Sequence, residues 1–164
     1  MCFMNRNNAS QLIILSGPVQ TGKSAALMNW INGKSVCGFI TPTISGKKMM
    51  FDISIGETSP FELTTSEINS IPIGKYHLAK SAFDKAKKIL TQSMASPKNW
   101  IVIDEVGKLE LINEGHHSLI TELLASWEYN ILLVVRTSIL TEVILKYGLK
   151  NPVIIEKESL KDFC

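Results

Sequence analysis

The chain has 164 residues, of which 45% are hydrophobic and 20% are charged, and its formal net charge is +2. This length and composition predict one globular domain over residues 1–164, most simply a monomer. The balanced charge argues against a nucleic-acid-binding protein, no stretch approaches the ~18 apolar residues of a membrane span, and three widely spaced cysteines indicate a reduced, cytoplasmic protein.

The N-terminal half of the chain predicts a strand, a helix, a hairpin and a loop. Residues 11–16 form a short apolar run of the kind that is buried on both faces of a parallel sheet. The helix expected over 23–31 ends at an Asn-Gly pair. Residues 36–41 and 48–55 flank a glycine-containing turn and predict an antiparallel β-hairpin. Residues 56–72 are rich in Ser, Thr and Pro and predict a long surface loop.

The C-terminal half alternates helices with buried strands. Apolar residues recur at helical spacing over 78–94, and Pro97 prevents the helix from continuing. Further helices are expected around 119–127 and 138–148, and strands at 100–106, 130–136 and 152–156. Strands that alternate with helices imply crossover connections. The chain is therefore expected to be an α/β protein, with a mostly parallel central sheet flanked by helices and an added antiparallel β-hairpin.

Residues 17–24 read GPVQTGKS, which fits the phosphate-binding pattern G-x-x-x-x-G-K-[ST]. The glycines permit backbone angles at which successive N–H groups point at an anion, and the helix that follows favours the same charge. Lys23 can reach the β- and γ-phosphates, and the Ser24 hydroxyl can bind Mg²⁺. The alternative is a chance match in a glycine-rich turn, which the position between a buried strand and a helix disfavours. The expected nucleotide-binding residues are Gly17, Pro18, Val19, Gln20, Thr21, Gly22, Lys23, Ser24 and Ala25.

Two acids lie at the end of the apolar run 100–106. Mg²⁺ needs a second protein ligand, usually an acid at the end of a neighbouring buried strand, and Asp104 holds that position. Glu105 is placed to polarise a water molecule in line with the γ-phosphate. The alternatives are a pair of acids that caps a strand and, for Glu105, a hydrogen bond that only orients loop 106–110. We therefore expect Ser24 and Asp104 as metal ligands, and Glu105 and Lys23 as catalytic residues.

The segments IVIDEVGKLEL, CGFIT followed by FDI, and IGKYHLAKSAFDKA together resemble the small P-loop nucleoside-triphosphatase family of thermophile and cancer-related nucleoside triphosphatases. The first resembles the family signature D-E-[IV]-G-K-[ML]-E-L, the second resembles the family's hairpin, and the third resembles a further family segment. The resemblance spans residues 11–156. It implies a P-loop fold and Mg²⁺-dependent hydrolysis of nucleoside triphosphates, with Asp104 as metal acid and Glu105 as water-activating acid. Gly107, Lys108 and Glu110 complete the signature.

The sequence departs from the family pattern at two places. Gln20 stands where the phosphate loop usually has glycine, and Thr43 and Ser45 stand where the hairpin usually has a glutamate and an arginine. The next basic pair in the hairpin is two lysines, at 47–48, and lysine is a poor substitute for a bidentate guanidinium. Arg136, at the carboxyl end of the strand at 130–136, is therefore a third candidate catalytic residue. Its alternative is a surface arginine bound to a helix C-terminus.

The other polar and aromatic residues have structural interpretations. Thr137 is expected to be the N-cap of the following helix, and a hydrogen bond to the attacking water or the γ-phosphate is the alternative. His116 and His117 are adjacent on an expected helix and are interpreted as surface residues. The lysines of segment 80–88 are expected to form a solvated helix face. The tryptophans expected in the core are Trp30, Trp100 and Trp127.

These observations favour a Mg²⁺-dependent nucleoside-triphosphatase that converts ATP, GTP and other NTPs to NDP and phosphate with loose base specificity. A small nucleotide or nucleoside kinase is the alternative enzyme, because the same loop can transfer phosphate to a bound acceptor. A nucleotide-binding switch module with little turnover is a third hypothesis, which the missing hairpin arginine favours.

Overall fold

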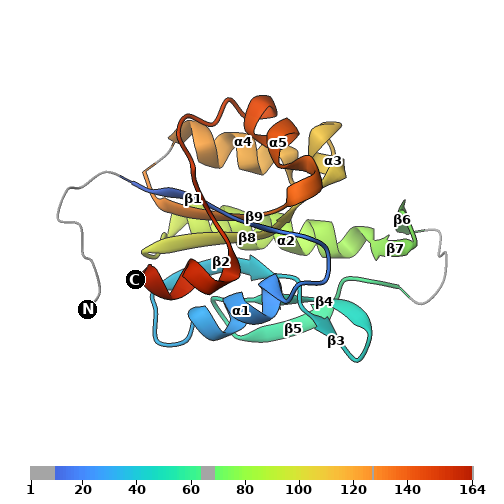
Figure 1. The fold of residues 1–164 in the computed structure, drawn as a ribbon. Helices are drawn as coiled ribbons and strands as arrows, with labels where there is room; N and C mark the ends of the chain where they lie inside the picture. The colour runs from blue at the N-terminus through green and yellow to red at the C-terminus, as the bar shows by residue number, and fades with distance from the viewer. Residues whose placement is uncertain (1–9, 64–68, 127, 164) are drawn as a thin grey trace.

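The fold is known from a computed structural model that describes residues 10–63, 69–126 and 128–163. In these residues the main sheet has the strand order β10-β1-β9-β8-β2-β4-β3, and β5 pairs with β4 (Figure 1). The strands from β10 to β2 are parallel to one another. Their bounds are β1 Leu12–Gly17, β2 Val36–Ile40, β8 Trp100–Val106, β9 Asn130–Arg136 and β10 Val153–Ile155. The expected mostly parallel sheet is confirmed.

An antiparallel extension continues the sheet beyond β2. Strand β4, Lys47–Asp52, pairs with β2, with β3 at Thr43–Ile44 and with β5 at Glu57–Pro60. Ser45 and Gly46 connect β3 to β4 with φ angles of 51° and 79°, the left-handed conformation that two-residue hairpin turns use. The expected hairpin is therefore present, and its first strand also belongs to the parallel sheet.

The prediction of a long loop over 56–72 is wrong where the structure describes it. This segment contains β5 and also β6, Ser70–Ile73, which pairs with β7, Tyr76–Ala79, in a separate two-stranded sheet. Residues 64–68 lie outside the described part. Ser, Thr and Pro suggested a loop, but edge strands accept these residues because one side of an edge strand carries no ladder hydrogen bonds.

Helices cover both faces of the sheet. The helices are α1 Lys23–Trp30, α2 Lys80–Ala95, α3 Lys108–Leu111, α4 His117–Ser126 and α5 Leu140–Lys146, with 3₁₀ helices η1 Thr137–Ile139 and η2 Lys157–Asp162. Helices α2, α4 and α5 pack on one face, and α1 and η2 pack on the other. Figure 1 shows α4 and α5 at the top of the view and α1 at the bottom. Strand alternation explains this, since Leu12 and Ile14 of β1 face the first group of helices while Ile13 and Leu15 face the second.

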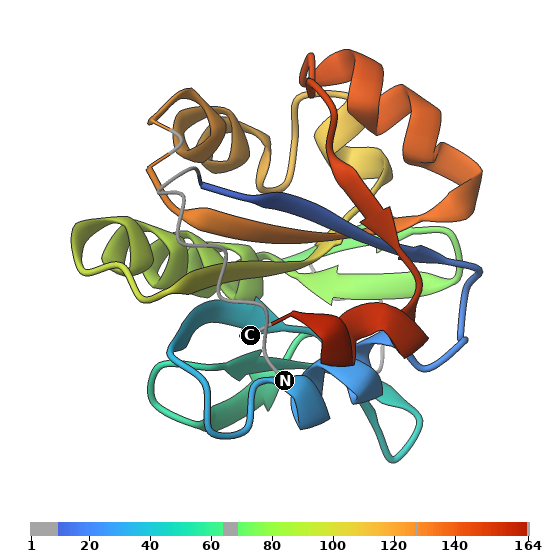
Figure 2. The same ribbon diagram turned by 60° about the vertical axis from the view of Figure 1, so that its left-hand side comes forward.

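The C-terminal end of the described chain lies beside α1, as the red and blue helices of Figure 2 show. The indole Nε1 of Trp30 donates a hydrogen bond to the Phe163 carbonyl at 3.0 Å, and its ring packs edge-on against Trp100 with centroids 5.6 Å apart. Both tryptophans are buried, as expected, whereas Trp127 lies outside the described residues. Lys80, Lys87 and Lys88 of α2 are exposed, as expected for a solvated face, and Lys85 is half-buried.

Gly38 shows why strand β2 needs a glycine. Its φ angle is +99°, and a Cβ atom there would lie 2.1 Å from the carbonyl oxygen of Val102 in the neighbouring β8. Any other residue would force β2 and β8 apart. The glycine thus allows the close approach of β2 to β8, the strand that carries Asp104 and Glu105. Within the described residues, no helix is both long and apolar enough to cross a membrane.

Candidate functional site

The segment GPVQTGKS connects β1 to α1, as the sequence predicted. Gly17 is the last residue of β1, and Gly22 precedes α1 with a left-handed φ of 83°. The first N–H groups of a helix have no partner within it, so the start of α1 presents donors and a positive dipole end to the loop. This arrangement suits a bound phosphate.

Gln20 adopts a backbone conformation that favours glycine. Its φ angle is 60°, in the left-handed region that costs a side-chain-bearing residue about 1–2 kcal/mol. The resemblance implied a glycine at this position, and the geometry explains why. The chain keeps the loop geometry with a less suitable residue.

Lys23 is folded back over the loop. Its side-chain nitrogen Nζ donates hydrogen bonds to the carbonyl oxygens of Gly17, at 2.9 Å, and Pro18, at 2.6 Å. The residue is 7% exposed, and burial lowers the pKa of its ammonium group, although the negative charges of Glu105 and Asp104 oppose that shift. Lys23 is therefore a desolvated cation at the end of the phosphate loop.

Asp104 and Ser24 meet although their elements are far apart in the chain. The Ser24 hydroxyl donates to Oδ2 of Asp104 at 2.7 Å, and the backbone N–H of Thr41 donates to the same oxygen at 3.1 Å. Asp104 is 1% exposed, and burial raises the pKa of its carboxyl group against the effect of these hydrogen bonds. The expectation that this acid ends a strand next to β1 is wrong, since β9 lies between β1 and β8. The side chains nevertheless converge, because all three strands are parallel and end at the same edge.

A register irregularity explains how two consecutive acids serve one cleft. Ile103 pairs with Leu133 and Val106 with Val135, so β8 has one residue more than β9 in this interval. With strict alternation, the side chains of Asp104 and Glu105 would lie on opposite faces of the sheet. The extra residue in β8 changes the direction of the side chains beside it. Both acids line the same cleft.

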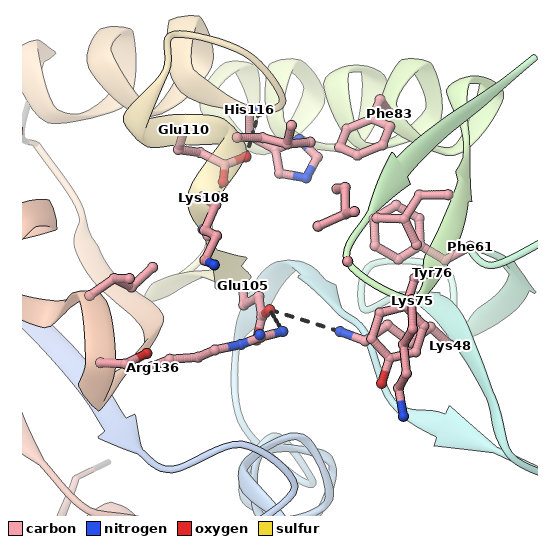
Figure 3. Close-up of a pocket in the computed structure, with 17 residues that line it drawn as sticks. Lys48, Phe61, Lys75, Tyr76, Phe83, Glu105, Lys108, Glu110, His116 and Arg136 are labelled. Atoms are coloured by element: carbon pink, nitrogen blue, oxygen red, sulfur yellow. Dashed lines mark hydrogen bonds and ion pairs between the residues drawn. The ribbon is translucent and has the colours of Figure 1, made fainter.

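Glu105 lies between two cations (Figure 3). Its Oε1 accepts a hydrogen bond from Nη2 of Arg136 at 2.5 Å, and Nζ of Lys48 lies 3.8 Å from the same oxygen. Arg136 is at the end of β9 in register with Gly17, which places it beside the start of the phosphate loop. Arg136 is therefore a site residue whose side chain binds Glu105. Sequence reasoning noted the lysines at 47–48 but did not place Lys48 in the site.

These residues enclose a cleft of about 410 Å³. Residues 19–25 form its phosphate-loop wall, and its opposite wall comes from the β2–β4 hairpin, β7 and the ends of β8 and β9. The residues outside the phosphate loop that line it are Thr41, Pro42, Thr43, Lys48, Tyr76, Asp104, Glu105 and Arg136. The sequence-predicted residues from 19 to 25 and both acids thus share one cleft with Arg136.

Glu110 holds loop 106–110 in the described part of the chain. The Glu110 carboxylate accepts hydrogen bonds from the backbone N–H groups of Gly107, at 2.7 Å, and His116, at 2.9 Å. Glu110 is 3% exposed, and burial raises its pKa. Gly115 is required beside it, because a Cβ atom there would lie 2.3 Å from Glu110 Oε1. Glu110 is a structural residue that fixes the segment following Asp104 and Glu105.

Two side-chain predictions near the site are wrong. His116 is buried, not on the surface, because its ring packs between Phe39 and Phe83 at centroid distances of 5.0 and 5.2 Å. Thr137 is not an N-cap, since it is the first residue of η1 and Ile139 caps α5. A contact that the sequence analysis missed is Lys157 of η2, whose Nζ donates to the Thr21 carbonyl at 2.6 Å. Only the tertiary fold brings η2 to the phosphate loop.

Comparisons with known proteins agree with this geometry. A family model described as NTPase matches residues 12–155. The crystal structure of THEP1 from the hyperthermophile Aquifex aeolicus is similar, with a TM-score of 0.74 and 21% sequence identity over 93% of this chain and 95% of that chain. The solution structure of a human cancer-related nucleoside triphosphatase has a TM-score of 0.70 and 20% identity over 94% of this chain and 95% of that chain. No curated protein sequence matches the chain. The chain belongs to the NTPase family and has the α/β P-loop NTPase fold.

Proposed function

We propose that the protein is a Mg²⁺-dependent nucleoside-triphosphatase that hydrolyses NTP to NDP and phosphate with loose base specificity. The observation that carries this proposal is the position of Glu105. Its carboxylate lies in the same cleft as Lys23 and the phosphate loop, one residue from an acid that binds Ser24. A carboxylate in that position can accept a proton from water as the oxygen attacks the γ-phosphorus.

The cations of the cleft have distinct roles in this mechanism. Lys23 exchanges the carbonyl oxygens of Gly17 and Pro18 for the β- and γ-phosphate oxygens of the nucleotide, since an anion is a stronger partner for a desolvated ammonium. Arg136 and Lys48 line the same cleft and contact Glu105. Both cations can stabilise the negative charge that develops on the equatorial γ-phosphate oxygens in the transition state.

Ser24 and Asp104 are the residues that would hold Mg²⁺. A hydroxyl and a carboxylate 2.7 Å apart suit this ion, which binds few protein oxygens and keeps several waters. When bound, Mg²⁺ would supply positive charge that neutralises part of the negative charge of the triphosphate. The missing hairpin arginine was the argument for a switch module with little turnover. Lys48 weakens that argument, because it supplies a cation from the same hairpin. We place this activity in the reducing cytoplasm, which fits the buried free thiol of Cys37. We also propose that the protein acts as a monomer.

The experiment is phosphate release from ATP, GTP, CTP and UTP, each with Mg²⁺ and with EDTA. We expect turnover only with Mg²⁺ and less than about tenfold variation in kcat/KM, or roughly 1.4 kcal/mol, because no base-reading motif is present in the sequence. A thousandfold preference for one nucleotide, or equal rates in EDTA, would contradict the proposal.

A further inference from the structure

A second cavity, of about 190 Å³, adjoins the phosphate cleft at Glu105 (Figure 3). Lys48, Tyr76, Glu105 and Arg136 line both spaces, while no described residue of the phosphate loop lines the second. With the γ-phosphate at Glu105, as the proposed function has it, the second cavity is on the γ-phosphate side of the triphosphate.

The far end of this cavity is aromatic. Phe61 and Phe83 pack with centroids 5.4 Å apart, and the His116 ring lies 5.2 Å from Phe83. Figure 3 shows these rings across the cavity from Arg136 and Lys108. The cavity has room for one six-membered ring with a small substituent.

His116 gives the aromatic end a polar group. The residue is 3% exposed and is one of the side chains that line the cavity. Burial lowers the pKa of His116 to about 4, so its ring is neutral near pH 7 and offers one N–H donor and one acceptor nitrogen. A ring heteroatom of a ligand can form a hydrogen bond with the His116 ring.

The near end of the cavity carries the charges. Glu105 is there with its partners Arg136 and Lys48, and Lys108 also lines this end. A hydroxyl is the nucleophile that needs a base when it attacks a phosphorus atom, whereas a phosphate oxygen has no proton to lose. The carboxylate at this boundary therefore suits a hydroxyl at the near end.

We propose that this cavity binds a small heteroaromatic alcohol as an acceptor of the γ-phosphoryl group. The ring packs against Phe61 and Phe83, a ring heteroatom lies at His116, and the hydroxyl points at Glu105. In the reaction the alcohol O–H bond breaks and its proton passes to Glu105, an O–Pγ bond forms, and the bond from Pγ to the β–γ bridging oxygen breaks to release NDP. The acceptor role rests on the proposed triphosphate site, whereas binding in the cavity does not.

The test uses 3-(hydroxymethyl)pyridine as the probe and 3-methylpyridine, which lacks the hydroxyl, as its control. Binding is measured by saturation-transfer NMR on the whole protein, without nucleotide. Ser138 lines the cavity and is exposed, so Ser138→Trp blocks the space without disturbing the core, and Thr141→Trp on the exposed part of α5 is the matched control. Phe83→Leu removes one ring wall and provides a second, independent perturbation.

We expect the wild type and Thr141→Trp to bind both compounds with millimolar affinity. Ser138→Trp and Phe83→Leu should bind them at least fivefold more weakly. Absence of binding to the wild type, or equal binding to Ser138→Trp, would overturn the assignment of the cavity. Single turnover of γ-labelled ATP should then transfer label to the hydroxymethyl probe and none to 3-methylpyridine. Label found only in inorganic phosphate would overturn the acceptor role. Probe binding by a protein that hydrolyses no NTP would support the cavity and contradict the proposed function alone.

Discussion

The phosphate cleft and the aromatic cavity meet at Glu105, yet they are assembled in different ways. The cleft takes its main groups from two short continuous segments, the loop after β1 and the end of β8. The cavity is lined by residues from many segments, namely β4, the segment before β6, the β6–β7 hairpin, α2, the ends of β8 and β9, residues 107–110, His116 and η1. The difference teaches that a site built from local segments can be predicted from the sequence, whereas a site built from scattered side chains depends on the tertiary fold.

Replacement of the cleft's central cation should have the largest effect. Lys23→Ala removes the desolvated ammonium that contacts the phosphate loop, and we expect kcat/KM to fall about 10²–10³-fold together with triphosphate affinity. Calorimetry with a non-hydrolysable triphosphate measures the affinity. Lys87→Ala, on the exposed face of α2, is the control. Undiminished binding to folded Lys23→Ala would remove the phosphate site from the cleft.

The pH dependence of protein stability tests the burial of His116 in the aromatic cavity. Because the folded-state pKa of His116 is about 4 and the ordinary value is 6.5, the unfolded chain takes up this proton first as the pH falls. Stability is then lost between about pH 6.5 and pH 4, by about 3 kcal/mol in total. His116→Phe should lack this loss, while the buried acids contribute equally to both proteins. Urea unfolding at pH 4 and pH 7 measures the difference, and parallel pH dependences would show that His116 is not buried in a neutral state.

Arg136 and Lys48 line both the cleft and the cavity, and their substitutions measure how much each cation contributes to the rate. Arg136→Ala should lower kcat at least tenfold with little change in KM, since Arg136 is the cation in direct contact with Glu105. Lys48→Ala should have a smaller effect, about threefold, because its nitrogen is 3.8 Å away. Arg136→Lys should not restore the rate, because lysine lacks the planar fork. A normal kcat for Arg136→Ala would return this residue to a structural role.

The smallest effect is expected in the backbone of the phosphate loop. Gln20→Gly should increase the free energy of unfolding by up to about 1 kcal/mol relative to Gln20→Ala, because glycine adopts a φ angle of 60° without strain. Urea unfolding of the two variants compares them directly. Equal stability would mean that the left-handed conformation is not maintained at this position.

The sequence predicted the cleft well for a physical reason. The phosphate loop and the two acids lie at the ends of apolar strands whose burial pattern is unambiguous, and parallel strands bring their carboxyl ends to one edge. The strand order was beyond this pattern, so the insertion of β9 between β1 and β8 was not foreseen.

The sequence could not predict contacts that depend on distant segments. Lys48 approaches Glu105 only because the β2–β4 hairpin folds over the cleft, and Lys157 reaches Thr21 only because η2 packs beside α1. His116 looked like a surface residue beside another histidine, since only the packing of Phe39 and Phe83 shows that it is buried. The Ser, Thr and Pro content of 56–72 concealed two edge strands.

The central claim is that Glu105 activates the nucleophile, and Glu105→Gln tests it most directly. The amide keeps the size of the side chain and can still accept a hydrogen bond from Arg136, but it cannot take a proton. Single-turnover hydrolysis of ATP should fall about 10²–10⁴-fold, while affinity for a non-hydrolysable triphosphate changes little. Asp104→Asn, the matched change one residue earlier, should instead weaken the dependence on Mg²⁺. Hydrolysis by Glu105→Gln at the wild-type rate would contradict the account.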